Sequence, residues 1–362
     1  MELKGEGLKR VKPYVAVILL QCGNSGFALI AKAALNKGTN HFTFAVYRNA
    51  FAAALFIPFS LLLERKGRPR MTTGVFAKIL MLAVLDPVLG QNMFYAGMNL
   101  TTVTFTAALS NLLPAITFVI AWILRVEKVD FKRIGSHAKI AGTAVAVAGA
   151  MVMTLVSGPT VGLPWTHSSH DGSAALPRHR SSSNPTAGDL MVVAGNFGYA
   201  LFFILQAHTL KSYPAVLSLT ALICTTGALL GTVLTFAVER GNTAIWALGW
   251  NATLLAYVYG GVVASGITYF IAGVIMKEKG PVFLTSFNPL SLVIVAILSS
   301  FVFAEQMTVG KITGAIVIVA GVYLFIWGKS KDAIVDDRDA AEPLPKGEDA
   351  EESQTVAVAN AV

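Results

Sequence analysis

The stretch GNSGFAL, Gly23 to Leu29, returns almost unchanged as GNFGYAL, Gly195 to Leu201, 172 residues further along the chain. Both copies lie inside long apolar segments, and each combines two glycines with one asparagine. Three further pairs follow in the same order, at offsets of 172 to 175 residues: Pro114 with Pro289, Gly135 with Gly310, and KIAG (139–142) with KITG (311–314). An ordered series of matches indicates an internal repeat.

The composition places both halves of this repeat in a membrane. The 362 residues are 54% hydrophobic and 13% charged, which leaves too little polar surface for a soluble globule of this size. Unbroken apolar windows of about 20 residues, the length of a helix that crosses a bilayer, occur ten times, whereas a β-barrel would need short alternating segments. We predict an all-α integral membrane protein with transmembrane helices near 13–36, 42–63, 75–98, 104–124, 136–156, 188–208, 215–238, 250–273, 282–303 and 309–327.

The number of crossings fixes the relation between the halves. Five is odd, so the second five-helix half must run upside down relative to the first. Inverted repeats are typical of secondary transporters, whose solute site lies near the bilayer midplane where the halves meet. The predicted organisation is a cytoplasmic N-terminus (1–12), a first repeat (13–156), a flexible outer linker (157–187), a second repeat (188–328) and an acidic, disordered cytoplasmic tail (329–362).

The basic residues sort by side of the membrane. With a cytoplasmic N-terminus, 17 Lys and Arg residues fall on the inner side and five on the outer side. The positive-inside rule therefore predicts that both termini are cytoplasmic, and the net charge of +8 needs no nucleic-acid partner. The first apolar run is too long for a cleaved signal peptide, so we expect it to be a retained span.

Polar and helix-breaking residues gather at mid-membrane depth. Asparagine side chains offer both a donor and an acceptor, and a polar side chain in lipid requires a partner. We predict that the solute pathway is lined or gated by Asn24, Arg48, Asp86, Gln91, Asn111, Asn196 and Asn288. Predicted helix breaks are Gly23, Gly26, Pro114, Gly195, Gly198 and Pro289. Helix packing through small residues is the alternative for the four glycines and the more usual role of glycines in membrane helices, and Pro289 is expected to kink its helix.

Two charged residues leave alternatives open. Asp86, about eleven residues into the third span, is either a proton-coupling or amine-binding group or half of a structural ion pair. Arg48 could reach the outer interface, pair with Asp86 or bind the carboxylate of a solute. Phosphate loops, zinc-spaced histidine pairs and nucleophile elbows are missing from the sequence, so we expect no enzyme activity, no metal and no cofactor.

Several local motifs carry a family resemblance. YRN (47–49) followed by ERKGRPRM (64–71) resembles the plant nodulin-like family of EamA-type transporters, also called Walls-Are-Thin-related or UMAMIT proteins. Similar stretches run along nearly the whole chain: AALSNLLPAITF (107–118), LKSYPAVLSLT (210–220), KGPVFLTSFNPL (279–290) and WGKSKD (327–332). The resemblance implies the ten-helix drug/metabolite-transporter fold with two EamA repeats. Many relatives have YRH at the first motif and Glu-Pro in place of Asp86-Pro87, and either difference could alter substrate or coupling.

The resemblance also implies a function. Members of the family resemble facilitators or exporters of amino acids, and some move auxin or related small acids. We therefore expect an alternating-access transporter of small organic solutes, most simply amino acids, with an auxin or other organic-anion carrier and a non-transporting receptor or scaffold as alternatives. The expected partners are the solute, possible protons and the lipid bilayer, with a homodimer left open. The expected location is the plasma membrane, with the vacuolar membrane as alternative.

Overall fold

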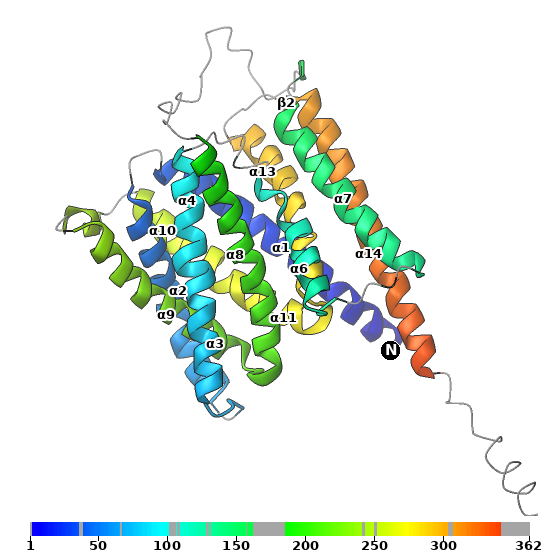
Figure 1. The fold of residues 1–362 in the computed structure, drawn as a ribbon, viewed down its shortest axis with the longest axis horizontal. Coiled ribbons are helices and arrows are strands. Elements are labelled where there is room, and N and C mark those ends of the chain that lie inside the picture. Colours follow the sequence, from blue (N-terminus) through cyan, green and yellow to red (C-terminus); the bar gives the residue numbers. More distant parts are fainter. Residues whose placement is uncertain are drawn as a thin grey trace, which may run out of the picture.

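The protein is a bundle of long helices in a computed structural model (Figure 1). The structure describes residues 2–35, 39–65, 67–100, 106, 109–127, 130, 132–156, 158–161, 185–240, 243–249, 252–302 and 307–341. Within these residues nine helices are long and apolar enough to cross a membrane. The predicted fourth span, 104–124, falls partly outside the described residues, and its described part is a shorter apolar helix, Leu113–Ile123.

The two halves contain matching elements. The first half comprises α1 (Glu2–Leu35), α2 (His41–Leu63), α3 (Thr73–Ala83), the π-helix η1 (Val84–Gly90), α4 (Gln91–Leu100), α6 (Leu113–Ile123) and α7 (Ile134–Leu155). The second comprises α8 (Pro185–Ser212), α9 (Val216–Val238), the short 3-10 helix η2 (Thr243–Trp246), α10 (Ala252–Tyr259), the π-helix η3 (Gly260–Ile267), α11 (Thr268–Lys279), α12 (Pro281–Thr285), α13 (Asn288–Val302) and α14 (Val309–Ala341).

The third span of each half is interrupted at the same place by a π-helical turn. The first turn, η1, begins at Val84 and the second, η3, begins at Gly260, an offset of 176 residues that agrees with the sequence repeat. Pro87 in η1 has no N–H group to complete an α-helical ladder. Such wider turns occur often at functional sites.

The two predicted proline breaks lie at the beginnings of helices. Pro114 is the second residue of α6, after a turn at Asn111–Leu112, and Pro289 is the second residue of α13, after a turn at 286–287. A proline in the first helical turn sacrifices no hydrogen bond. The expectation that Pro289 kinks its helix is therefore wrong, because the chain ends one helix, α12, and starts another.

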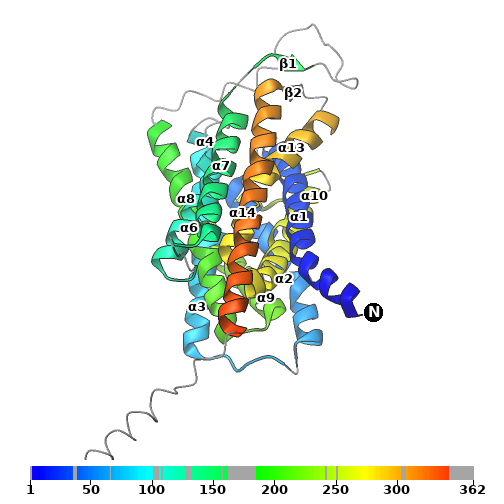
Figure 2. The same cartoon turned by 90° about the vertical axis from the view of Figure 1, so that its right-hand side faces the viewer.

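The last helices of the two halves, α7 and α14, lie side by side as a separate pair at the edge of the molecule (Figures 1 and 2). They cross through glycines spaced seven residues apart: Gly135, Gly142 and Gly149 on α7, and Gly314, Gly321 and Gly328 on α14. A Cβ atom on Gly142 would lie 2.4 Å from the backbone nitrogen of Phe325, so no larger residue fits between the helices. Close backbone contact of this kind is typical of helix packing in membranes.

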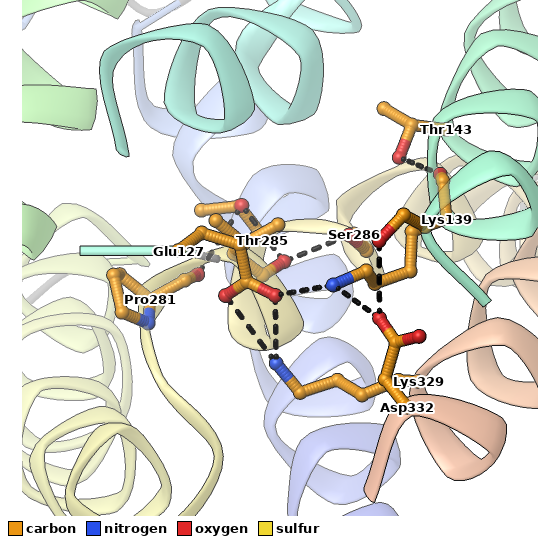
Figure 3. A network of polar contacts seen from close by, with 10 residues as sticks. Glu127, Lys139, Thr143, Pro281, Thr285, Ser286, Lys329 and Asp332 are labelled. Carbon is orange, nitrogen blue, oxygen red and sulfur yellow. Dashed lines mark hydrogen bonds and ion pairs between the residues drawn. The ribbon is translucent and has the colours of Figure 1, made fainter. Parts of the chain in front are cut away.

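Ion pairs around the buried Lys139 join the start of α7 to α14 (Figure 3). The ammonium of Lys139 lies 3.1 Å from a carboxylate oxygen of Glu127 and 2.8 Å from one of Asp332, and Lys329 also contacts Glu127. Helix α14 continues through these residues to Ala341, so the segment from 329 does not begin as the disordered tail expected from the sequence. Its first residues belong to the folded bundle.

The ends of the described chain lie at one end of the bundle. The first residues of α1 and the last turns of α14 lie toward the end that also holds the α2–α3 connection (Figures 1 and 2). At the opposite end, the strands β1 (Thr160–Val161) and β2 (Met307–Thr308) pair antiparallel, and so attach the start of the 157–187 segment to the second half.

Candidate solute-binding cavity

A cavity of about 330 Å³ opens between the two halves. All seven polar residues singled out in the sequence line it: Asn24, Arg48, Asp86, Gln91, Asn111, Asn196 and Asn288. They come from α1, α2, η1, α4, α8, α13 and the turn before α6, which are far apart in the sequence. The volume lies within the range that holds a small organic molecule.

The asparagines are anchored around the wall of the cavity. Asn24 accepts a hydrogen bond from the Thr268 hydroxyl at 2.9 Å, and Asn196, its equivalent in the repeat, donates to the backbone oxygen of Leu109 at 3.1 Å. Asn288 accepts from the amide of Gln21 at 3.1 Å. Asn111 is buried, and its Nδ2 atom forms no hydrogen bond within the described part of the chain.

Asp86 is buried in η1 and held by two donors. The Tyr269 hydroxyl and the Gln91 amide both donate to its Oδ2 atom, the latter at 3.1 Å. Within the described residues, no hydrogen bond reaches Oδ1. A carboxylate fixed through one oxygen in this way presents the other as an acceptor.

Arg48 is buried at 7% exposure and does not reach the interface, so the alternative in which it snorkels is wrong. Its Nε atom donates to the hydroxyl of Ser265 at 2.7 Å, and its guanidinium lies over the ring of Phe27, 5.5 Å from the centroid. Arg48 and Asp86 both belong to the described part of the chain, and no guanidinium nitrogen of Arg48 lies within 4.0 Å of a carboxylate oxygen of Asp86. The cavity therefore holds a cation and a carboxylate that do not directly neutralise each other.

The predicted helix breaks at the four glycines are wrong, because α1 and α8 run through these positions as unbroken α-helices. Gly195 lines the cavity, whereas Gly23, Gly26 and Gly198 do not. A Cβ atom on Gly23 would lie 2.9 Å from Val263, and one on Gly198 would lie 3.0 Å from a backbone oxygen of Leu85. Helix packing thus explains these positions. Pro114 and Pro289 are also absent from the lining.

The aromatic part of the wall was not predicted from the sequence. Phe27, Phe94, Tyr95, Tyr199 and Tyr269 face the cavity. A signal existed for two of them, because Phe27 and Tyr199 occupy the same place in the repeated heptad, three residues after each asparagine. Tyr269 has no such signal, since its partner Asp86 is 183 residues away in the sequence.

Comparison with known proteins agrees with this architecture. The model of the EamA-like transporter family matches residues 12–155 and 186–327, one match for each half. Three proteins of Arabidopsis thaliana are similar over most of the chain. WAT1-related protein At2g39510 is 50% identical (93% of this chain, 91% of the relative), At2g37460 is 46% identical (91% and 86%), and At4g08290 is 44% identical (94% and 89%).

A solved structure described only as the crystal structure of a protein has the same fold. It superposes with a TM-score of 0.64 over 87% of this chain and 96% of the other, at 16% sequence identity. Fold, cavity and comparisons together define a multi-pass membrane transporter. The chain belongs to the EamA-like transporter family, among its plant WAT1-related members.

Proposed function

We propose that the protein transports amino acids across the membrane, as a facilitator or exporter working by alternating access. The observation that carries this proposal is the presence of Arg48 and Asp86 in one cavity without a direct ion pair between them. A solute that carries both a carboxylate and an ammonium group complements these two side chains at once.

Each part of an amino acid has a chemical counterpart in the cavity. The terminal nitrogens of Arg48 suit a bidentate contact with the carboxylate. Oδ1 of Asp86 suits the ammonium, and the same carboxylate is the candidate site for a coupled proton. The apolar side chain would lie against aromatic rings such as Phe27 and Tyr199.

The transport cycle follows from the inverted halves. Rocking of one half against the other would open the midplane cavity to each side in turn. The proposed orientation has both termini in the cytoplasm, as the basic residues indicate. We place the protein in the plasma membrane, with the vacuolar membrane as the alternative.

A solute panel on the purified full-length protein in liposomes tests the proposal, run with and without a pH gradient. We expect uptake of amino acids, and we expect Arg48→Gln to reduce it at least about tenfold, since a hydrogen-bonded charge contact is lost. Arg240→Gln, at an exposed arginine after α9, is the matched control and should transport normally. Absence of amino acid flux in the unmodified protein would contradict the proposal.

An organic-anion carrier is the second candidate, favoured by one observation. Tyr269 and Gln91 already donate to Asp86, so part of its acceptor capacity is used within the protein. Arg48 would then be the main charge offered to a solute. Competition by indole acids and not by amino acids would establish this candidate in place of the first.

A further inference from the structure

One turn at the junction of η3 and α11 contacts both charged side chains of the cavity. Ser265 and Tyr269 are four residues apart and are buried at 0% and 1% exposure. The Ser265 hydroxyl accepts from Nε of Arg48 at 2.7 Å, and the Tyr269 hydroxyl donates to Oδ2 of Asp86. The first half of the chain thus supplies both charges, and the second half supplies both hydroxyls that hold them.

The helix that carries these hydroxyls is fixed against α2. A Cβ atom on Gly261 would lie 2.7 Å from the backbone oxygen of Arg48 and 3.2 Å from the nitrogen of Ala52. The two backbones are therefore in close contact beside the guanidinium. This contact leaves Ser265 little freedom to move away from Arg48.

Tyr269 is held equally firmly on the other side. Its ring packs on that of Phe202, with centroids 5.1 Å apart, and its backbone oxygen accepts from the amide of Gln206 at 3.2 Å. Gln91 lies 3.2 Å from the Tyr269 hydroxyl, so tyrosine, glutamine and carboxylate form one connected network. Oε1 of Gln91 has no hydrogen-bond partner among the described residues, so the three bonds of this network restrict the tyrosine hydroxyl and the carboxylate, and not every polar atom of the glutamine.

We propose that Ser265 and Tyr269 are positioning residues that determine solute selectivity. Ser265 orients the guanidinium that receives the carboxylate of a solute, and Tyr269 orients the carboxylate that receives its ammonium. One helical turn therefore sets the relative placement of the two charges, because it carries the hydrogen-bond partner of each. The inference rests on the proposed function, because it assigns one charged group of the solute to each hydroxyl.

A purely structural role for these hydroxyls predicts a different effect of their removal on ligand affinity. If they serve only packing, removing either one weakens every ligand alike. If they position charges, each removal weakens only the ligands that carry the corresponding group. Phenylalanine, phenylpropionate and phenylethylamine separate the two cases, since they share a phenyl ring and differ in which charged groups they carry.

The experiment measures dissociation constants of these three compounds with the purified full-length protein. For Ser265→Ala we expect about a tenfold higher Kd for phenylalanine and phenylpropionate, with phenylethylamine within about twofold of its original value. For Tyr269→Phe we expect about a tenfold higher Kd for phenylalanine and phenylethylamine, with phenylpropionate within about twofold. Equal weakening of all three compounds, or no weakening, overturns the inference.

Matched controls come from buried hydroxyls away from the cavity. Ser218→Ala and Tyr213→Phe remove the hydroxyls of residues that are 1% and 0% exposed and do not line the cavity. Both should keep the original Kd for all three compounds. If Ser265→Ala is not monodisperse, Ser265→Cys replaces the hydroxyl by a weakly accepting thiol of similar size and carries the same expectation.

The unmodified protein separates failure of the inference from failure of the proposed function. If it binds phenylalanine and the variants do not discriminate among the ligands, the positioning role is wrong and the amino acid proposal stands. If it binds none of the three compounds, the amino acid proposal fails. Binding of phenylpropionate alone overturns that proposal together with the role assigned to Tyr269.

Discussion

At the residue scale, each charged side chain of the cavity is hydrogen-bonded to neutral partners. Arg48 bonds to Ser265, and Asp86 bonds to Tyr269 and Gln91. An isolated ionised group in a low-dielectric interior is costly, and hydrogen bonds from neutral side chains reduce that cost. Because both charges are stabilised without being paired, each remains available to a solute or a proton.

Replacing Asp86 by Asn tests its role as a proton site. Asparagine keeps the size of the side chain and removes the titratable group, so we expect pH-dependent flux to disappear. The measurement is uptake into liposomes between about pH 5 and about pH 8. Asn92→Ser is the control. It alters a nearby buried amide that does not line the cavity, adds no charge and should preserve the pH profile. An unchanged profile in Asp86→Asn removes this role.

At the scale of elements, glycine contacts and ion pairs join α7 to α14. The glycines allow the backbones to touch, and the ion cluster of Glu127, Lys139, Lys329 and Asp332 joins the start of α7 to α14. Neither feature lines the cavity. We therefore expect substitutions here to change stability more than solute affinity.

Gly142→Ala should destabilise the helix pair. The new methyl group would collide with the backbone of α14 near Phe325, and overpacking of this kind costs about 1–3 kcal/mol. Gly74→Ala in α3 is the matched control, because nothing lies within 4 Å of its added Cβ atom. A thermal unfolding scan in detergent should show a lower Tm for Gly142→Ala alone. Equal Tm values for Gly142→Ala and Gly74→Ala would show that the close backbone contact at Gly142 does not contribute to stability.

Lys139→Met should be more damaging. Its side chain is only 3% exposed and its ammonium contacts two carboxylates, so the substitution leaves Asp332 without this cation and Glu127 with Lys329 alone. Removing one partner from a buried ion pair costs about 3–5 kcal/mol. Lys211→Met, at an exposed lysine, should leave the unfolding temperature unchanged. A variant Lys139→Met as stable as the control would assign the cluster no stabilising role.

At the scale of the whole molecule, the halves are related by an inverted repeat that appears in several independent features. The π-turns η1 and η3 interrupt equivalent spans, and the turns before α6 and α13 place Asn111 and Asn288 on the same cavity. The charges do not follow the repeat, because Arg48 and Asp86 both belong to the first half. The helical scaffold thus occurs twice in the chain, whereas the charged side chains proposed to bind the solute occur only in the first half.

The proposed orientation gives a topology prediction. Epitope tags at both ends should be reached by antibody only after cells are permeabilised, whereas a tag inserted between 162 and 184 should be reached on intact cells. The physical reason is the excess of basic residues at the end of the bundle where α1 begins and α14 ends. Tags on opposite sides would contradict the even number of crossings.

The sequence alone determined the class of fold and the polar lining of the cavity. Apolar runs have the length of membrane helices whatever packs around them, and a polar side chain in such a run needs a protein or solute partner. For that reason Asn24, Asp86 and Asn196 could be singled out before any contact was known.

Tertiary structure alone decided which groups meet. The bond from Arg48 to Ser265 joins residues 217 apart, and Tyr269 lies 183 residues from Asp86, so local pattern carries no information about either contact. The same holds for the ion cluster, in which Glu127 follows α6 and Asp332 lies on α14. Hydrogen bonds and ion pairs depend on distances of a few ångströms, and only the packing of the helices sets those distances.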